Sequence, residues 1–228
     1  RYGWLPGAVL LGIGVGIYQA YLSLAMVLIL FLLVRDIILA GEEKFGRALY
    51  QQYLKYLGMG VLSLLFYKVS LEIMCRVERI ELVNHHGLGS IHFPSLSEFL
   101  QAIKQSIIDT IYYYVGSLSK LNLYGISSLI SLLILGIFLV MMVYKKKAYK
   151  HGSHLLLAAV SLLLIPCACH CFYFVTNEVE YYALMQFPLV LSFVFLFWEY
   201  EQVDTKRAIG QWGVVLSTVI LVYVLIVS

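Results

Sequence analysis

Charged side chains are scarce in this sequence. Asp, Glu, Lys and Arg make up 13% of its 228 residues, and 61% of the residues are hydrophobic. Soluble domains carry roughly a quarter charged residues and about 45–50% apolar ones. A soluble fold of this length could not bury so much apolar surface. The composition therefore indicates a protein dissolved in lipid, and the small net charge of +3 gives no sign of a nucleic-acid partner.

Familiar catalytic motifs are also missing from the sequence. It contains no nucleophile elbow, no phosphate-binding loop and no zinc-protease motif, and no internal repeat is evident. These absences argue against the common hydrolase and nucleotidase classes. They leave any catalytic constellation to be found by other means.

Long apolar runs are what the sequence has instead. In a bilayer only helices and closed barrels satisfy their backbone hydrogen bonds, and uninterrupted apolar runs of about 20 residues favour helices over alternating barrel strands. We expect an all-α polytopic transmembrane helical bundle, with 1–228 forming a single membrane domain. The predicted spans are residues 5–34, 56–75, 121–144, 155–175, 181–198 and 208–228. The first run is counted as one crossing, which could be one long tilted helix or could break near Tyr18 and Gln19. Because the chain begins at Arg1 and not Met, inside an apolar segment, we expect it to be the C-terminal part of a longer protein.

Basic residues predict the orientation of these spans. Lys145, Lys146, Lys147 and Lys150 cluster between the third and fourth spans, and such loops face the cytoplasm. Alternation then places segment 35–55 inside and segment 76–120 outside. The prediction is a multi-pass protein whose partner is the lipid bilayer.

The outer segment 76–120 contains an amphipathic pattern. Its apolar residues recur at spacings of three and four, which is typical of one helical stripe. Ser95 and Glu98 follow Pro94 in the spacing of a capping box, which predicts that a helix begins there. The stripe could lie on the outer membrane surface or dock on the bundle, and periodicity does not distinguish these alternatives.

Lys68 and Glu72 are ionisable residues inside the second predicted span, 56–75. They lie four residues apart and so share one helix face. Charges within a membrane are costly and indicate function by default, although the two could simply pair with each other. If they line a cavity, Lys68 suits a phosphate and Glu72 suits a sugar hydroxyl or a proton.

Other chemistry-bearing residues gather at the predicted outer side. Arg76 and Arg79 end the second span, and Glu178 lies in a short acidic loop that could bind sugar hydroxyls or a divalent cation. Histidines 85, 86 and 92 match no metal-ligand spacing. Cys167 and Cys171 would share a helix face with Cys169 pointing away, which favours buried thiols or a disulfide to Cys75.

The stretch Gly16-Ile-Tyr-Gln-Ala-Tyr-Leu-Ser23, followed by a long apolar run, resembles the bacterial Gtr-type glucosyltransferase family. The later order is similar: a mixed-charge loop, a span with Tyr67, and an outer helix that ends in Tyr112, Tyr113 and Tyr114. These are polytopic, GT-C-like enzymes of the bacterial cell membrane. The resemblance implies transfer of glucose from a polyprenyl-phosphate-linked donor to a surface polysaccharide such as O-antigen, or to a lipid-linked acceptor, on the outer face of the cell envelope.

The resemblance also implies where a site would lie. The catalytic acidic residue of such enzymes lies in an outer loop upstream of Arg1, so no numbered residue takes that role. A donor phosphate would need a cation, with Lys68, Arg76 and Arg79 as candidates. Tyr112 and Tyr113 could contact a sugar. A lipid-linked glycan flippase, a polysaccharide polymerase and a non-enzymatic scaffold remain alternatives.

Overall fold

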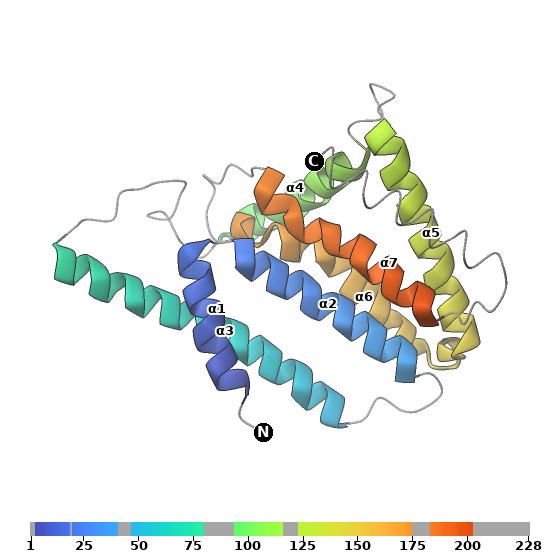
Figure 1. Cartoon of the computed structure of the whole chain (residues 1–228), viewed down its shortest axis with the longest axis horizontal. Helices are drawn as coiled ribbons and strands as arrows, with labels where there is room; N and C mark the ends of the chain where they lie inside the picture. The colour runs from blue at the N-terminus through green and yellow to red at the C-terminus, as the bar shows by residue number, and fades with distance from the viewer. Residues whose placement is uncertain are drawn as a thin grey trace.

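The computed structural model of this chain describes residues 3–18, 20–40, 47–79, 94–115, 123–174 and 183–202. Within these ranges every regular element is a helix and no strand occurs, which confirms the all-α class (Figure 1). The α-helices are α1 Trp4–Ile17, α2 Ala20–Ala40, α3 Arg47–Glu78, α4 Leu96–Val115, α5 Leu123–Lys145, α6 Gly152–Cys169 and α7 Leu191–Gln202. Short 3₁₀ helices are η3 Ala148–Lys150, η4 Cys171–Phe174 and η5 Ala183–Val190.

Three of the described helices are long and apolar enough to cross a membrane. They are α2, residues Tyr50–Glu78 of α3, and α6. Apolar helices of this length are what a bilayer requires, so the chain is a helical membrane protein. The predicted sixth span, 208–228, lies outside the described residues.

The first predicted span, 5–34, forms two helices and not one. Tyr18 between them is extended, with φ −153° and ψ 120°, and its backbone N–H donates to the carbonyl of Gly14. Gly12, Gly14 and Gly16 precede this break, and glycine weakens a helix because it gains the most backbone freedom on unfolding. Helix α2 then continues through Arg35 to Ala40, beyond the predicted end of the apolar run.

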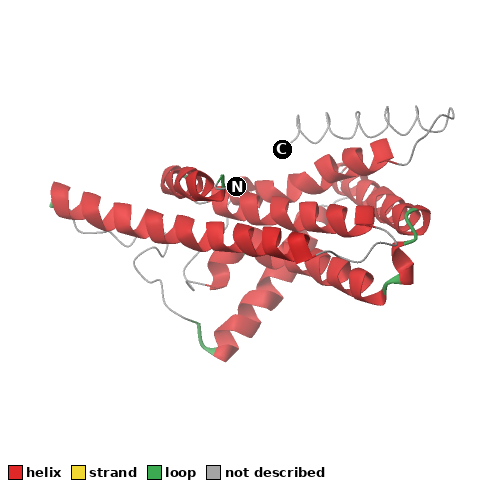
Figure 2. Cartoon of the chain, turned by 90° about the horizontal axis from the view of Figure 1, so that it is seen from below, coloured by secondary structure: helices red, strands yellow, loops and turns green. Residues whose placement is uncertain are grey.

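Helix α3 is much longer than the predicted second span, 56–75. Its 32 residues correspond to roughly 48 Å, which exceeds the about 30 Å of a hydrocarbon core. It begins at Arg47, inside the segment predicted as a polar inner loop, and its C-terminal part extends past the other helices (Figures 1 and 2). Helix α1 crosses α3 through small residues: Gly7 lies near Met59, Gly12 near Ser63 and Gly16 near Tyr67. Such contacts let two membrane helices approach closely.

Helix α4 begins with the predicted capping box, which is confirmed. The Ser95 N–H donates to the Glu98 carboxylate at 2.7 Å, and the Glu98 N–H donates to the Ser95 hydroxyl at 3.4 Å. The helix packs against α5, α6 and η4 with a face that contains buried Ala102 and Ser106. Much of the predicted apolar stripe stays exposed, including Leu96, Leu100, Ile107 and Ile111.

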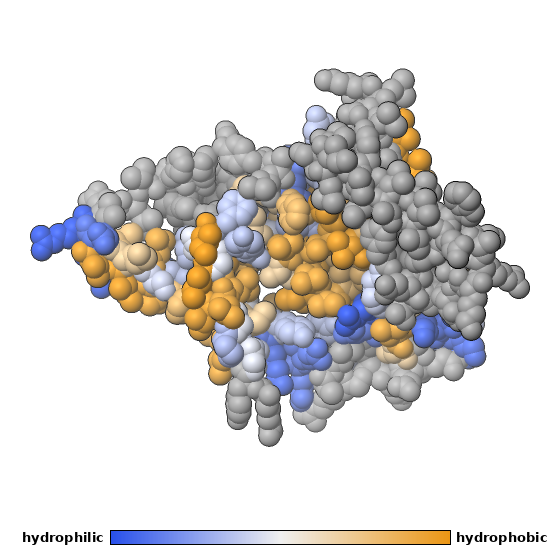
Figure 3. Space-filling model, in the orientation of Figure 1, coloured by the Kyte–Doolittle hydropathy of each residue, from blue (hydrophilic) through white to orange (hydrophobic). Residues whose placement is uncertain are grey.

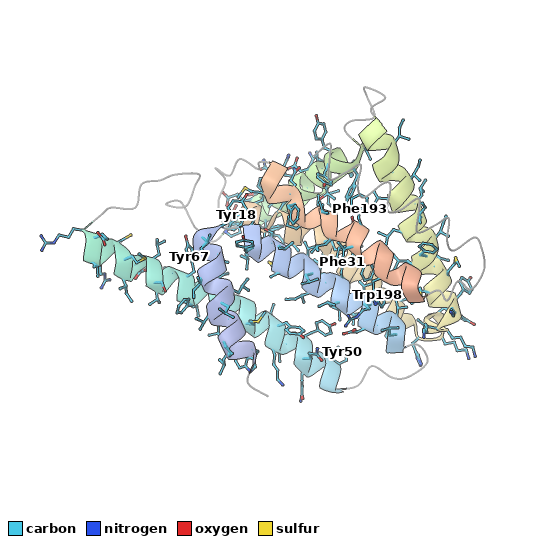
Figure 4. All side chains as sticks on the ribbon, viewed as in Figure 1. Tyr18, Phe31, Tyr50, Tyr67, Phe193 and Trp198 are labelled. Atoms are coloured by element: carbon cyan, nitrogen blue, oxygen red, sulfur yellow. The ribbon has the colours of Figure 1, made fainter. Side chains whose placement is uncertain are left out.

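The core lies between α2, α5, α6, η5 and α7. Phe31 of α2 packs on Phe195 of α7 with ring centroids 4.7 Å apart, and Phe193 is also buried there (Figure 4). The buried Tyr114 hydroxyl of α4 donates to the carbonyl of Leu189 at 2.9 Å. The predicted fifth span, 181–198, is η5 followed by α7, and Pro188 within η5 lacks the N–H that a regular α-helix would use.

Candidate functional site

A cavity of 1020 Å³ lies between α1, α2, α3 and the end of α6 with η4. Most of its lining is aliphatic or aromatic, with side chains such as Leu22, Met26, Ile29, Leu57, Leu64 and Phe172. The molecular surface around α1 and α2 is correspondingly hydrophobic, while hydrophilic residues gather at the free end of α3 (Figure 3). The cavity arises because α3 packs mainly against α1 and makes few contacts with α2.

Helix α3 supplies most of the polar groups in this cavity. Tyr50, Tyr53 and Tyr56 line it from successive turns, and Tyr67, about three turns farther along, lies near the crossing with α1 (Figure 4). From Tyr50 to Glu72 the helix rises roughly 33 Å at 1.5 Å per residue. The lining therefore extends over a length comparable with the whole hydrocarbon core of a bilayer.

Lys68 and Glu72 both line the cavity, one helical turn apart. Both are described residues, and neither forms an ion pair or hydrogen bond with another described residue. The mutual ion pair that would have satisfied them is thus not formed in the structure. An ammonium and a carboxylate, both exposed, thus stand at the edge of a mostly apolar cavity, where each can meet a ligand of opposite charge or a hydroxyl.

The cysteines divide as their spacing predicted. Cys167 and Cys171 line the cavity, while Cys169 on the other face is completely buried. All four cysteines are free thiols, so no disulfide joins Cys75 to them in the structure. The Cys171 thiol lies 3.4 Å from the hydroxyl of buried Ser23 on α2, which connects η4 to that helix.

A second polar group lies behind the cavity wall, between η4 and α4. The Tyr173 hydroxyl donates to Asp109 Oδ2 at 2.7 Å, and Gln105 Nε2 donates to Oδ1 at 2.9 Å. The ring of buried His170 stacks on Tyr173, with centroids 5.8 Å apart. Burial and then the Asp109 carboxylate raise the pKa of Tyr173 above its usual range, so that the phenol stays protonated at neutral pH.

The imidazole of His170 is held by the end of α6. Its Nδ1 lies 3.1 Å from the carbonyl of Pro166, and because a carbonyl only accepts, Nδ1 carries the proton. Burial lowers the pKa of His170, which leaves the ring neutral near pH 7.

The sequence matches the family described as glucosyl transferase GtrII over residues 2–198. The chain belongs to the GtrII glucosyl transferase family. The predicted resemblance to Gtr-type enzymes is confirmed, and membership assigns this chain a role in glucosyl transfer. No curated protein and no solved structure matches it.

In this GtrII chain the other predicted site residues that the structure describes do not line the cavity. Arg76 and Arg79 are exposed at the C-terminal end of α3, and Arg79 has a left-handed φ of 54° where the helix stops. Tyr112 is 72% exposed on α4. Tyr113 packs edge-on against Tyr114, with ring centroids 5.0 Å apart. Glu178 and the histidine loop fall outside the described residues.

One polar cluster of the GtrII chain was missed by sequence reasoning. Arg35 and Asp36 form an ion pair at 2.8 Å, and the Tyr53 hydroxyl donates to the other Asp36 oxygen at 2.8 Å. The Arg35 guanidinium also lies 5.8 Å from the centroid of the Trp198 ring. This cluster joins α2, α3 and α7 at the Tyr53 end of the cavity. The adjacent charges were visible in the sequence, but their tertiary partners were not.

Proposed function

We propose that this protein transfers glucose from a polyprenyl-phosphate-linked donor to a surface polysaccharide or lipid-linked acceptor, at the outer face of the bacterial cell membrane. Family membership supplies the glucosyl-transfer chemistry. The observation that carries the choice of donor is the cavity itself, which combines an extended apolar lining with the two charges of Lys68 and Glu72.

The apolar lining suits the hydrocarbon part of such a donor. Each CH₂ group removed from water gains about 0.8 kcal/mol, but a polyprenyl tail already lies in lipid and gains little more by changing its apolar surroundings. The cavity therefore serves to position the tail, and not to draw it out of the bilayer. Because the tail cannot leave the membrane, a lining as long as the hydrocarbon core keeps the phosphate near one end of the lining.

The charged end of the lining suits the head of the donor. Lys68 is a compact cation that pairs with a phosphate oxygen, and such charge-assisted contacts are roughly twice as strong as neutral ones. Glu72, one turn farther along α3, can accept hydrogen bonds from the glucose hydroxyls. In the predicted orientation both residues lie toward the outer side of the membrane, where the acceptor would be.

The remaining predicted site residues have subsidiary roles in this proposal. Arg76 and Arg79 would draw the anionic head group toward the end of α3 through long-range attraction. Tyr112, Tyr113 and Glu178 would contact the acceptor or the sugar, and Glu178 could hold a divalent cation with the acceptor. None of these roles requires the residues to line the cavity.

The test uses bacterial membranes that contain the full-length protein and a radiolabelled polyprenyl-phosphate glucose. Label that moves into lipid-linked or surface polysaccharide supports the proposal. Label that crosses the bilayer but stays on its lipid supports a flippase instead. A requirement for a pre-assembled oligosaccharide donor supports a polymerase. Membranes without the protein provide the background, and intact donor with no transfer overturns the proposal.

A further inference from the structure

The wall of the cavity formed by η4 has two sides. Cys171, Phe172 and Phe174 line the cavity, whereas the hydroxyl of Tyr173, in the same four-residue segment, bonds to Asp109 on α4. A 3₁₀ segment of four residues has few hydrogen bonds of its own and poorer hydrogen-bond geometry than an α-helix. The position of this segment therefore depends on its contacts with other helices.

Helix α4 holds this segment at two points. Asp109 accepts the Tyr173 hydroxyl at 2.7 Å, and the Phe99 ring packs edge-on against Phe174 with centroids 5.2 Å apart. The second Asp109 oxygen accepts a hydrogen bond from Gln105 on the same helix. This bond within α4 fixes the carboxylate that Tyr173 contacts. On the other side, Cys171 meets Ser23 of α2. The η4 wall is thus held by α4 on one side and by α2 on the other.

We propose that Asp109 and Tyr173 are positioning residues that hold the η4 wall against the lipid-linked donor. Neither side chain of this pair touches the donor; Asp109 acts through Tyr173, and Tyr173 acts through its neighbours Phe172 and Phe174. This inference rests on the proposed function for the identity of the ligand. It adds a specific pair of residues, on α4 and η4, that set the shape of the donor site.

Removal of the bond should weaken donor binding more than it slows chemistry. In Tyr173→Phe the ring remains and one hydroxyl is lost, so the protein should fold while the wall loosens. We expect the KM for polyprenyl-phosphate glucose to rise by about three- to tenfold, with kcat changed by less than about twofold, because hydrogen bonds to charged groups are the stronger ones. Asp109→Ala should raise KM to a similar extent. Asp109→Asn keeps an oxygen acceptor for the Tyr173 hydroxyl, so its KM should stay close to that of the wild type.

A double variant separates one shared bond from two independent effects. If Asp109 and Tyr173 act through their common bond, Asp109→Ala with Tyr173→Phe should raise KM little more than either change alone. Lys104→Gln is the matched control, because Lys104 is exposed on the same helix and does not line the cavity. Additive effects of the two changes would overturn the proposal.

Thiol labelling gives a readout that does not need catalysis. The Cys171 thiol lies in the same wall, and Cys75 on α3 serves as an internal reference. We expect N-ethylmaleimide to modify Cys171 several times faster, relative to Cys75, in Tyr173→Phe and Asp109→Ala than in the wild type or Lys104→Gln. Unchanged labelling of Cys171 in both variants would overturn the positioning role. If the wild type transferred no glucose, faster labelling would still support the role, and only the donor assignment would fail.

Discussion

Gly12 of α1 lies so close to α3 that a methyl group placed on it would stand 2.8 Å from the carbonyl oxygen of Ser63. The same methyl group would also meet the ring of Phe66 at 2.8 Å. We expect Gly12→Ala to separate α1 from α3, since overpacking costs about 1–3 kcal/mol and the gain in helix propensity offsets at most about 1 kcal/mol. Thermal unfolding in detergent should show a lower midpoint.

Gly14 provides the matched control for this change. It lies two residues away on the same helix, and a methyl group there would find Tyr21 at an ordinary 3.6 Å. Gly14→Ala should therefore keep or raise the midpoint, and the difference between the two variants isolates the close contact. Equal midpoints for both variants would contradict the tight α1–α3 crossing.

The Tyr53–Asp36 hydrogen bond should stabilise the contact between α2 and α3. Asp36 is mostly buried, with 19% of its side chain exposed, and also pairs with Arg35. Tyr53→Phe removes one bond to a charged group, so we expect a loss of about 1.5–3 kcal/mol in the free energy of unfolding. A double-mutant cycle with Asp36→Asn measures the coupling. Additive losses would show that the two side chains do not act together.

The local signals of this sequence predicted much of the helical structure. Apolar runs identified the membrane class because hydropathy reports directly on the solvent that a helix meets. Ser95 and Glu98 predicted the start of α4 because a capping box is made within four residues. Cys167 and Cys171 both line the cavity, as a shared face predicts, although α6 ends at Cys169 and Cys171 lies in η4.

Features that depend on tertiary contacts could not be predicted. The break at Tyr18 was one of two alternatives that the sequence left open, because the glycine-rich stretch before it has the hydropathy of a continuous span and its backbone bond to Gly14 is local. Helix α3 extends into the predicted inner loop, where the Tyr53 hydroxyl donates to Asp36 on another helix. Asp109 lies in the amphipathic segment 76–120, and its partner Tyr173 is 64 residues away. Single-sequence patterns carry no information on such pairs.

Lys68 should contribute to donor binding through its charge. With the ammonium removed in Lys68→Ala, the donor phosphate loses its partner in the cavity, and we expect kcat/KM for polyprenyl-phosphate glucose to fall by about 10- to 100-fold. Lys68→Arg should retain much of the activity, since it keeps the positive charge. Lys104→Ala, which removes an exposed lysine far from the cavity lining, is the control.

Glu72 should act on the sugar and not on the phosphate. Glu72→Gln keeps an oxygen that accepts hydrogen bonds but removes the charge, so we expect a smaller loss than in Glu72→Ala, about threefold against about tenfold in kcat/KM. Competition by polyprenyl phosphate without glucose should be unchanged in both variants. An equal loss of affinity for the sugar-free lipid would instead assign Glu72 to the shape of the cavity.

The four thiols, which lie on α3, α6 and η4, should differ in reactivity in the absence of any mutation. Cys75 is partly exposed and should react with N-ethylmaleimide first, whereas Cys169 is completely buried and should react only after denaturation. Cys167 and Cys171 line the cavity, so polyprenyl-phosphate glucose should slow their modification and leave Cys75 unaffected. Mass spectrometry of labelled membranes measures each site, with and without a reductant. Because all four are free thiols in the structure, the reductant should change nothing, and a gain at Cys75 would reveal a disulfide. Modification of Cys169 at the rate of Cys171 would contradict the burial of Cys169.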